Sequence, residues 1–279
     1  MDSYRSEGLT LSVADSGPPG APGAATVVLL HGFPQTPHAW ADVTPTLTAA
    51  GLHCLAPALR GTTPASRPAE RRAYRVEHLA GDVLALLEAG CLYDAHIVGH
   101  DWGGAVAWHL AQFHPHRVRT LTVLSTPHPA AMKYAMRHST QAWKSWYMLA
   151  MQVPRVPEAV IGWVLNRTGL RSLGLPAHHE AAYLAHLRSP GALTGAIGPY
   201  RAIPTRAVPG AGDPLTPLAV PTTYLWGRHD PYLGRVAAER TAAYCRGDYR
   251  FVDPDADHWL PEKHPRIVAE EILRRTGAG

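Results

Sequence analysis

Short apolar runs alternate with longer amphipathic stretches along most of this 279-residue chain. The apolar runs are typical of strands buried in a parallel sheet, and they occupy residues 26–30, 52–56, 95–98, 121–124, 220–226 and 249–252. Helical spacing of apolar positions is found at 36–49, 75–89, 105–113 and 265–275. An alternating segment at 9–13 predicts an edge strand. Strands that alternate with helices predict an α/β fold with a mostly parallel central sheet flanked by helices.

The alternation stops between residues 130 and 215. This block has helical patterns, prolines and aromatic residues, and it contains no clear buried strand. We therefore expect a helical cap domain at 130–215, inserted into a core domain that is formed by 1–129 and 216–279.

One sharp turn is predicted between the strand at 95–98 and the helix at 105–113. Residues 99–104 read Gly-His-Asp-Trp-Gly-Gly, so small residues surround the single acidic residue Asp101. Glycines suit a tight, strained turn because they carry no side chain. This pattern has the shape of the nucleophile elbow of the α/β-hydrolases, with Asp101 where esterases carry serine. The alternative is that Asp101 only caps a helix N-terminus.

Three further polar residues, His31, Asp230 and His258, also follow predicted strands. In open α/β sheets, ligands bind at the carboxyl ends of the strands. The chain order Asp101, Asp230, His258 is the order of nucleophile, acid and histidine in an α/β-hydrolase triad. Asp257 is an alternative acid, although the side chains of adjacent residues rarely face each other.

An aspartate nucleophile implies attack on a saturated carbon and a covalent ester intermediate. His258, oriented by Asp230, would then activate the water that hydrolyses this ester. The tetrahedral intermediate of that second step needs an oxyanion hole. We expect the backbone N–H groups of Phe33 and Trp102 to supply it.

Two motifs give the chain a specific resemblance. His31-Gly32-Phe33-Pro34 and residues 99–104 are similar to the corresponding motifs of the epoxide hydrolases with an α/β-hydrolase fold. The resemblance extends from residue 9 to residue 275. It implies a cofactor-independent enzyme that converts a small apolar epoxide and water into a vicinal diol.

The resemblance also implies roles for residues of the cap. The segments around Tyr147 and Tyr200 resemble those that carry the two tyrosines with which epoxide hydrolases hold and protonate the epoxide oxygen. A phenol suits this step because the alkoxide formed on ring opening is basic enough to take its proton. The alternative for both tyrosines is that they are aromatic residues that only pack inside the helical cap. The substrate-binding residues that we expect are His31, Pro34, Trp146, Met148, Met151 and Trp259.

Two other functions stay open. Dehalogenases of the same fold use the same ester chemistry, and Trp102, Trp143 and Trp146 offer indole N–H donors for a leaving halide. Many of those enzymes place the triad acid after the strand that precedes the cap, where this chain has Ser125. A non-catalytic ligand-binding protein is the second alternative, which the intact set of Asp101, Asp230 and His258 disfavours.

Composition excludes several partners. The net charge of +4 comes from scattered residues without a basic run, so no nucleic acid is expected, and no apolar run is long enough for a membrane span. Three isolated cysteines and a polar start without a signal-peptide pattern favour the cytoplasm. The oligomeric state, monomer or homodimer, stays open. No metal is expected, because the adjacent His178 and His179 should point apart on a helix and form a solvated cap surface.

Overall fold

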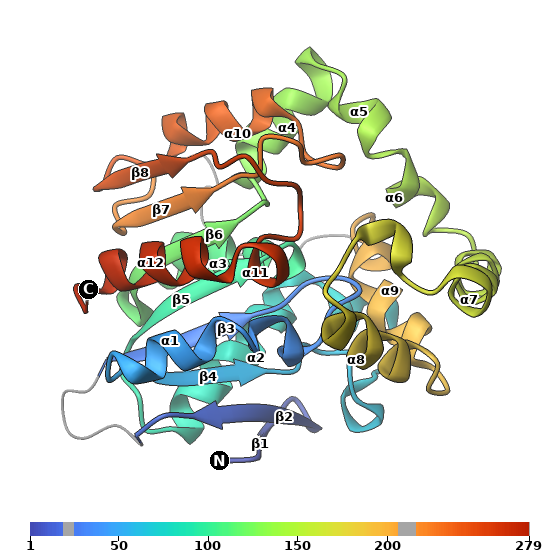
Figure 1. The fold of residues 1–279 in the computed structure, drawn as a ribbon, viewed down its shortest axis with the longest axis horizontal. Coiled ribbons are helices and arrows are strands. Elements are labelled where there is room, and N and C mark those ends of the chain that lie inside the picture. The colour runs from blue at the N-terminus through green and yellow to red at the C-terminus, as the bar shows by residue number, and fades with distance from the viewer. Residues whose placement is uncertain (19–24, 206–215, 279) are drawn as a thin grey trace.

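An eight-stranded sheet forms the centre of the computed structural model, which describes residues 1–18, 25–205 and 216–278 (Figure 1). The strand order is β1-β2-β4-β3-β5-β6-β7-β8, and the strands from β4 to β8 run parallel. The strands are β1 (Ser3–Ser6), β2 (Leu9–Ser16), β3 (Thr26–Leu30), β4 (His53–Pro57), β5 (Ala95–His100), β6 (Val118–Leu124), β7 (Thr222–Leu225) and β8 (Tyr249–Val252). The mostly parallel sheet predicted from the sequence is confirmed.

The antiparallel edge of the sheet differs from the prediction. The segment predicted as an edge strand is β2, and β1 pairs with its outer side. Glu7 and Gly8 connect the two strands, both with positive φ, as a two-residue hairpin turn requires. The sequence pattern missed β1 because this strand is short and mainly polar.

Helices cover both faces of the sheet (Figure 1). On one face, α2 and α3 pack their apolar side chains against Val28 and Leu30 of β3. On the other face, α1 and α12 pack against Val27 and Leu29 of the same strand. The alternation of these four residues follows from the two-residue period of a strand.

The core helices and 3-10 turns are η1 (Pro37–Trp40), α1 (Thr44–Ala49), η2 (Pro64–Ser66), η3 (Arg71–Tyr74), α2 (Val76–Ala89), α3 (Trp102–Phe113), η4 (Pro115–Arg117), α10 (Arg235–Arg240), η6 (Thr241–Tyr244), α11 (Leu260–Lys263) and α12 (Pro265–Thr276). The single helix predicted at 36–49 is wrong, since η1 and α1 replace it. Pro45 lacks the N–H that would continue a helix from η1, so a new helix begins there.

A run of helices lies between β6 and β7: α4 (Pro129–His138), α5 (Gln141–Lys144), α6 (Trp146–Ala150), α7 (Val156–Thr168), η5 (Arg171–Leu173), α8 (Ala177–Leu187) and α9 (Ala192–Ala202). In Figure 1, α5 to α9 lie at the right of the view, beyond the ends of the strands of the sheet. The end of the expected cap, residue 215, falls in the segment 206–215, outside the described residues. Among the described residues, no helix is both long and apolar enough to cross a membrane.

Candidate active site

Asp101 lies in a strained turn between β5 and α3. Its backbone has φ 51° and ψ −117°, a conformation that few residues other than glycine adopt. A Cβ on Gly99 would lie 2.2 Å from the carbonyl oxygen of Gly103, and a Cβ on Gly103 would lie 2.2 Å from that of Leu30. Only glycine therefore fits at these two positions. The side chain of Asp101 makes no helix-capping hydrogen bond, which argues against the capping interpretation.

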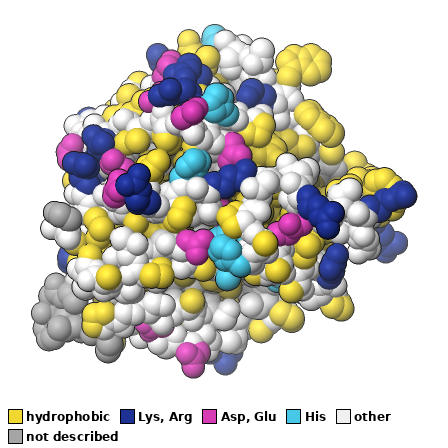
Figure 2. All heavy atoms as spheres, in the orientation of Figure 1, with side chains coloured by type: hydrophobic (Ala, Val, Ile, Leu, Met, Phe, Trp, Pro, Cys, Tyr) yellow, Lys and Arg dark blue, Asp and Glu magenta, His cyan; other side chains and the backbone are white. Residues whose placement is uncertain are grey.

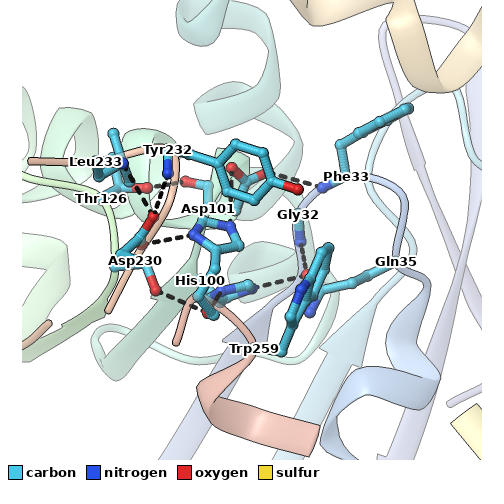
Figure 3. A network of polar contacts seen from close by, with 12 residues as sticks. Gly32, Phe33, Gln35, His100, Asp101, Thr126, Asp230, Tyr232, Leu233 and Trp259 are labelled. Carbon is cyan, nitrogen blue, oxygen red and sulfur yellow. Dashed lines mark hydrogen bonds and ion pairs between the residues drawn. The ribbon is translucent and has the colours of Figure 1, made fainter. Parts of the chain in front are cut away.

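The two oxygens of the Asp101 carboxylate have different neighbours (Figure 3). Oδ1 accepts a hydrogen bond of 2.8 Å from the backbone N–H of Phe33. Oδ2 lies 3.7 Å from Nε2 of His258. Gly32 permits this arrangement, because a Cβ at residue 32 would lie 2.3 Å from the Cβ of Asp101.

Asp230 holds the other side of the His258 ring. Its Oδ2 lies 2.7 Å from Nδ1 of His258, and its Oδ1 accepts hydrogen bonds of 2.8 and 2.9 Å from the backbone N–H groups of Tyr232 and Leu233 (Figure 3). The alternative acid, Asp257, accepts from the N–H of Trp259 and from Lys263 instead. The geometry thus brings together Asp101, His258 and Asp230, in agreement with the predicted triad.

The backbone of His258 is also fixed. Its carbonyl oxygen contacts Nε2 of His100 at 2.9 Å and accepts a hydrogen bond of 3.0 Å from the hydroxyl of Ser125. The other nitrogen of His100 lies 2.9 Å from Oε1 of Gln35 (Figure 3). The sequence analysis did not identify Gln35, and its only sequence signal is its position directly after the His-Gly-Phe-Pro motif.

The charges of the three residues depend on one another. Burial lowers the pKa of His258, but the carboxylates of Asp230 and Asp101 outweigh burial and raise this pKa to about 10. Burial raises the pKa of Asp101, but the hydrogen bond and charge of His258 outweigh it, so this pKa is lowered. The resting site therefore holds an imidazolium between two carboxylates.

A cavity of about 310 Å³ lies against Asp101 and His258. Tyr147 of α6 and Tyr200 of α9 line it, and their ring centroids are 6.0 Å apart. Burial, and then the negative charge of Asp101, raise the pKa of both phenols. Both hydroxyl groups therefore keep their protons at neutral pH and can donate hydrogen bonds to a ligand near Asp101.

Close packing of α9 on the core determines where Tyr200 lies. A Cβ on Gly198 would lie 2.3 Å from the ring of Tyr74 on η3, and a Cβ on Gly195 would lie 2.1 Å from the carbonyl oxygen of Gly61. The helix approaches the core closely only because both positions are glycine. Tyr200 then packs edge-to-face on Phe33, with ring centroids 5.5 Å apart.

Three of the six predicted substrate-binding residues, Pro34, Met151 and Trp259, line the cavity. His31 does not, because its ring is buried between two loops, where Nδ1 contacts the carbonyl oxygen of Gly32 and Nε2 accepts from the N–H of Leu59. It positions the loop that carries Phe33.

Trp146 and Met148 also lie outside the cavity wall. Successive helical residues are about 100° apart around the axis, so the turn that points Tyr147 and Met151 into the cavity directs their neighbours elsewhere. Trp146 is 65% exposed. Figure 2 shows hydrophobic side chains on this part of the surface, over α5 and α6.

The cavity wall also includes residues that the sequence analysis missed. Tyr232 lies between Tyr147 and His258, with ring centroids 5.9 and 5.0 Å away. Its only sequence signal is its place two residues after Asp230. The remaining apolar wall comes mainly from α7 and the η5 segment, with one residue of α8, and consists of Val160, Ile161, Val164, Leu165, Leu170, Leu173 and Leu187.

The expectation for the histidine pair on α8 is wrong. His179 is fully buried, and the rings of His178 and His179 lie side by side with centroids 4.2 Å apart. Both Nε2 atoms contact the same oxygen of Asp42, at 2.9 and 3.0 Å. The packing of α8 against the core segment that carries Asp42 turns both rings the same way.

Comparisons with known proteins agree with this geometry. The family described as alpha/beta hydrolase fold matches residues 25–189. AB hydrolase superfamily protein YfhM of Bacillus subtilis is 34% identical and covers 95% of this chain and 94% of its own. Epoxide hydrolase A of Mycobacterium tuberculosis is 31% identical, with 95% and 94% covered. The crystal structure of epoxide hydrolase A from Mycobacterium thermoresistibile has a TM-score of 0.82 at 26% identity and covers 98% of this chain and 96% of that one. The chain therefore belongs to the α/β-hydrolase fold family and, within it, to the epoxide hydrolases.

Proposed function

We propose that this enzyme hydrolyses small apolar epoxides to vicinal diols through an ester on Asp101. One observation carries the proposal: the Asp101 carboxylate lies between the N–H of Phe33 and the His258 ring, in a cavity that Tyr147 and Tyr200 line. The largely apolar wall, mainly from α7 and the η5 segment, supports an apolar substrate.

Ring opening uses the two tyrosines and the free oxygen of Asp101. Tyr147 and Tyr200 hold the epoxide oxygen by hydrogen bonds, and Oδ2 of Asp101 attacks a ring carbon. The C–O bond of the epoxide breaks as the new ester bond forms, and the oxygen takes a proton from one phenol. Oδ1, which the N–H of Phe33 already contacts, becomes the carbonyl oxygen of the ester.

Ester formation changes the charge around His258. It removes the negative charge of Asp101, which is one of the two carboxylates that raise the pKa of His258. The imidazolium becomes more acidic, and a proton passes from it to the phenolate. Neutral His258, held by Asp230, is then the base for the second step.

Hydrolysis restores the resting enzyme. His258 takes a proton from water, and the resulting hydroxide attacks Cγ of Asp101. Negative charge develops on Oδ1, where the N–H of Phe33 stabilises it, together with the N–H of Trp102 in the first turn of α3. Collapse of this intermediate breaks the bond between Cγ and the ester oxygen. The leaving alkoxide takes the remaining proton of the attacking water, so the diol is released and Asp101 is again a carboxylate beside the imidazolium.

Trapping the ester tests this proposal. We expect His258→Gln to form the ester and to hydrolyse it slowly, so mass spectrometry of a peptide digest should find Asp101 heavier by the mass of an aryl epoxide. Asp101→Ala should carry no such adduct. A wild-type enzyme that forms diol while no variant carries an adduct at Asp101 would contradict the covalent mechanism.

The dehalogenase alternative has less support. Trp143 and Trp146, two of the expected indole donors, are 81% and 65% exposed and do not line the cavity. The position after β6 holds Ser125, whose hydroxyl binds the carbonyl oxygen of His258. Halide release from a haloalkane, measured beside diol formation, distinguishes the two reactions.

We also place the enzyme in the cytoplasm. This proposal is supported by Cys54, Cys91 and Cys245, which are all free in the structure, as is typical of proteins from a reducing compartment.

A further inference from the structure

A second cluster of chemically active side chains lies where α8 packs against the core. One ring nitrogen from each of His38, His178 and His179 lies within 4.8 Å of the other two. Oδ2 of Asp42 lies 2.9 Å from Nε2 of His178 and 3.0 Å from Nε2 of His179. Among the described residues, this is the only group of three histidine, cysteine or acidic residues with the spacing of metal ligands.

Hydrogen bonds within the protein do not satisfy this cluster. Nε2 of His38 and Nδ1 of His179 are buried, and neither has a hydrogen-bond partner among the described residues. A buried polar atom without a partner is destabilising. The pairing of His178 and His179 with Asp42 therefore explains only part of the arrangement, and a ring nitrogen of His38 is left without a partner.

Glu180, the acidic neighbour of the pair in the sequence, is not part of the cluster. Its Oε1 accepts a hydrogen bond of 3.1 Å from the N–H of Leu170 within the cap. The carboxylate that the cluster uses is Asp42, from a distant part of the chain.

We propose that His38, Asp42, His178 and His179 bind a divalent transition-metal ion, with Zn²⁺ as the representative ion. Three imidazoles and one carboxylate form a donor set that suits zinc. Zinc–nitrogen bonds of about 2.0–2.1 Å in a tetrahedral site place neighbouring ligand atoms about 3.3 Å apart. The two contacts of Asp42 are already close to this separation. The wider nitrogen–nitrogen distances need ring movements of about 1 Å, which the half-exposed side chain of His178 permits.

The ion would link the core to the cap. His38 and Asp42 belong to the segment of η1 and the residues that follow it, whereas His178 and His179 belong to α8, which packs beside this segment (Figure 1). Leu187 at the end of α8 lines the active-site cavity. Metal binding would thus fix a helix that forms part of the cavity wall, and it does not depend on the chemistry at Asp101.

Zinc titration of the full chain tests this proposal. The protein is first treated with a chelator and dialysed, and Zn²⁺ is then titrated by calorimetry. We expect one equivalent to bind with a micromolar or lower Kd. We also expect Tm to rise by about 5–10 °C at a zinc concentration one hundred times Kd, since the ion binds only the folded state. Co²⁺ at the same site should give the visible absorption of a four-coordinate ion.

Two variants of the cluster locate the site, and one variant outside it is the control. Asp42→Asn and His178→Ala should each weaken zinc binding at least tenfold and, at the same zinc concentration, reduce the rise in Tm to about half or less. His78→Ala is the matched control, since His78 is a surface histidine that pairs with one carboxylate, Glu7, at 2.8 Å, and it should bind zinc as the wild type does. Circular dichroism checks that each variant folds. If Asp42→Asn or His178→Ala does not fold, His38→Gln is tested in its place. Wild-type protein without saturable binding, or equal binding by the cluster variants, would overturn the proposal.

Discussion

Nε2 of His258 lies 3.7 Å from Oδ2 of Asp101, while its Nδ1 lies 2.7 Å from Asp230. The ring is therefore an imidazolium that two carboxylates stabilise, and its pKa is raised from 6.5 to about 10. Folding favours this protonated form. The stabilisation is fully present below pH 6.5 and is lost as the pH rises through 10.

We predict that Asp101→Asn weakens this pH dependence. Removal of one carboxylate should lower the pKa of His258 below that of the wild type, so the free energy of unfolding should fall less steeply between pH 6.5 and 10. Urea unfolding across this pH range measures the slope. Asp248→Asn, which changes a carboxylate that is 77% exposed, should keep the wild-type slope. An unchanged slope in Asp101→Asn would show that Asp101 does not set the charge of His258.

Gly32→Ala should displace the proposed nucleophile. The new Cβ would lie 2.3 Å from the Cβ of Asp101, so the carboxylate must move, and a shift of about 1 Å costs about 100-fold in rate. We expect kcat/KM for diol formation to fall by about this factor. Gly81→Ala on α2 is the matched control, because a Cβ there has open space. It should keep full activity and gain about 0.5–1 kcal/mol of stability, since alanine is the better helix former.

Substitution of the two cavity tyrosines should affect ring opening. Tyr147→Phe and Tyr200→Phe each remove a hydroxyl group that donates to the epoxide oxygen, so kcat should fall by about 10²–10⁴-fold, the usual contribution of general acid catalysis. Tyr134→Phe, which changes a cap tyrosine outside the cavity wall, should retain wild-type kcat. Steady-state assays of diol formation measure all three. Full activity in a variant that carries both Tyr147→Phe and Tyr200→Phe would mean that these two side chains only pack.

The two candidate acids can be separated by one pair of substitutions. Asp230→Asn removes the carboxylate that holds His258 at 2.7 Å, and we expect kcat to fall by about 10³–10⁴-fold, as for other histidines that lose their orienting acid. Asp257→Asn breaks only the contacts with Trp259 and Lys263. It should change stability by less than about 1 kcal/mol and leave kcat within a few-fold of the wild type. The reverse order of effects would reassign the acid.

The sequence by itself determined the parallel part of the sheet and where the candidate triad residues follow its strands. Asp101 could be identified because a strand, a sharp turn and a helix follow one another locally, and glycine is required where a Cβ would lie 2.2 Å from a neighbouring carbonyl oxygen. His31-Gly32-Phe33-Pro34, Asp230 and His258 follow strands whose parallel pairing brings their carboxyl ends to one edge of the sheet. These features depend on local geometry and on strand order, and both leave a clear pattern in the chain.

Only the tertiary structure decided how the helices between β6 and β7 face the core. Helix α6 is short, and its apolar residues lie on all sides, so its sequence does not say that Tyr147 points inward while Trp146 points to solvent. Helix α7 is longer, but apolar residues lie on several of its sides too, so its sequence did not indicate which of them line the cavity. The meeting of His38 with His178 and His179 depends on the docking of α8 on a segment about 140 residues away in the chain. Such contacts depend on the packing of two surfaces against each other, which a local pattern does not record.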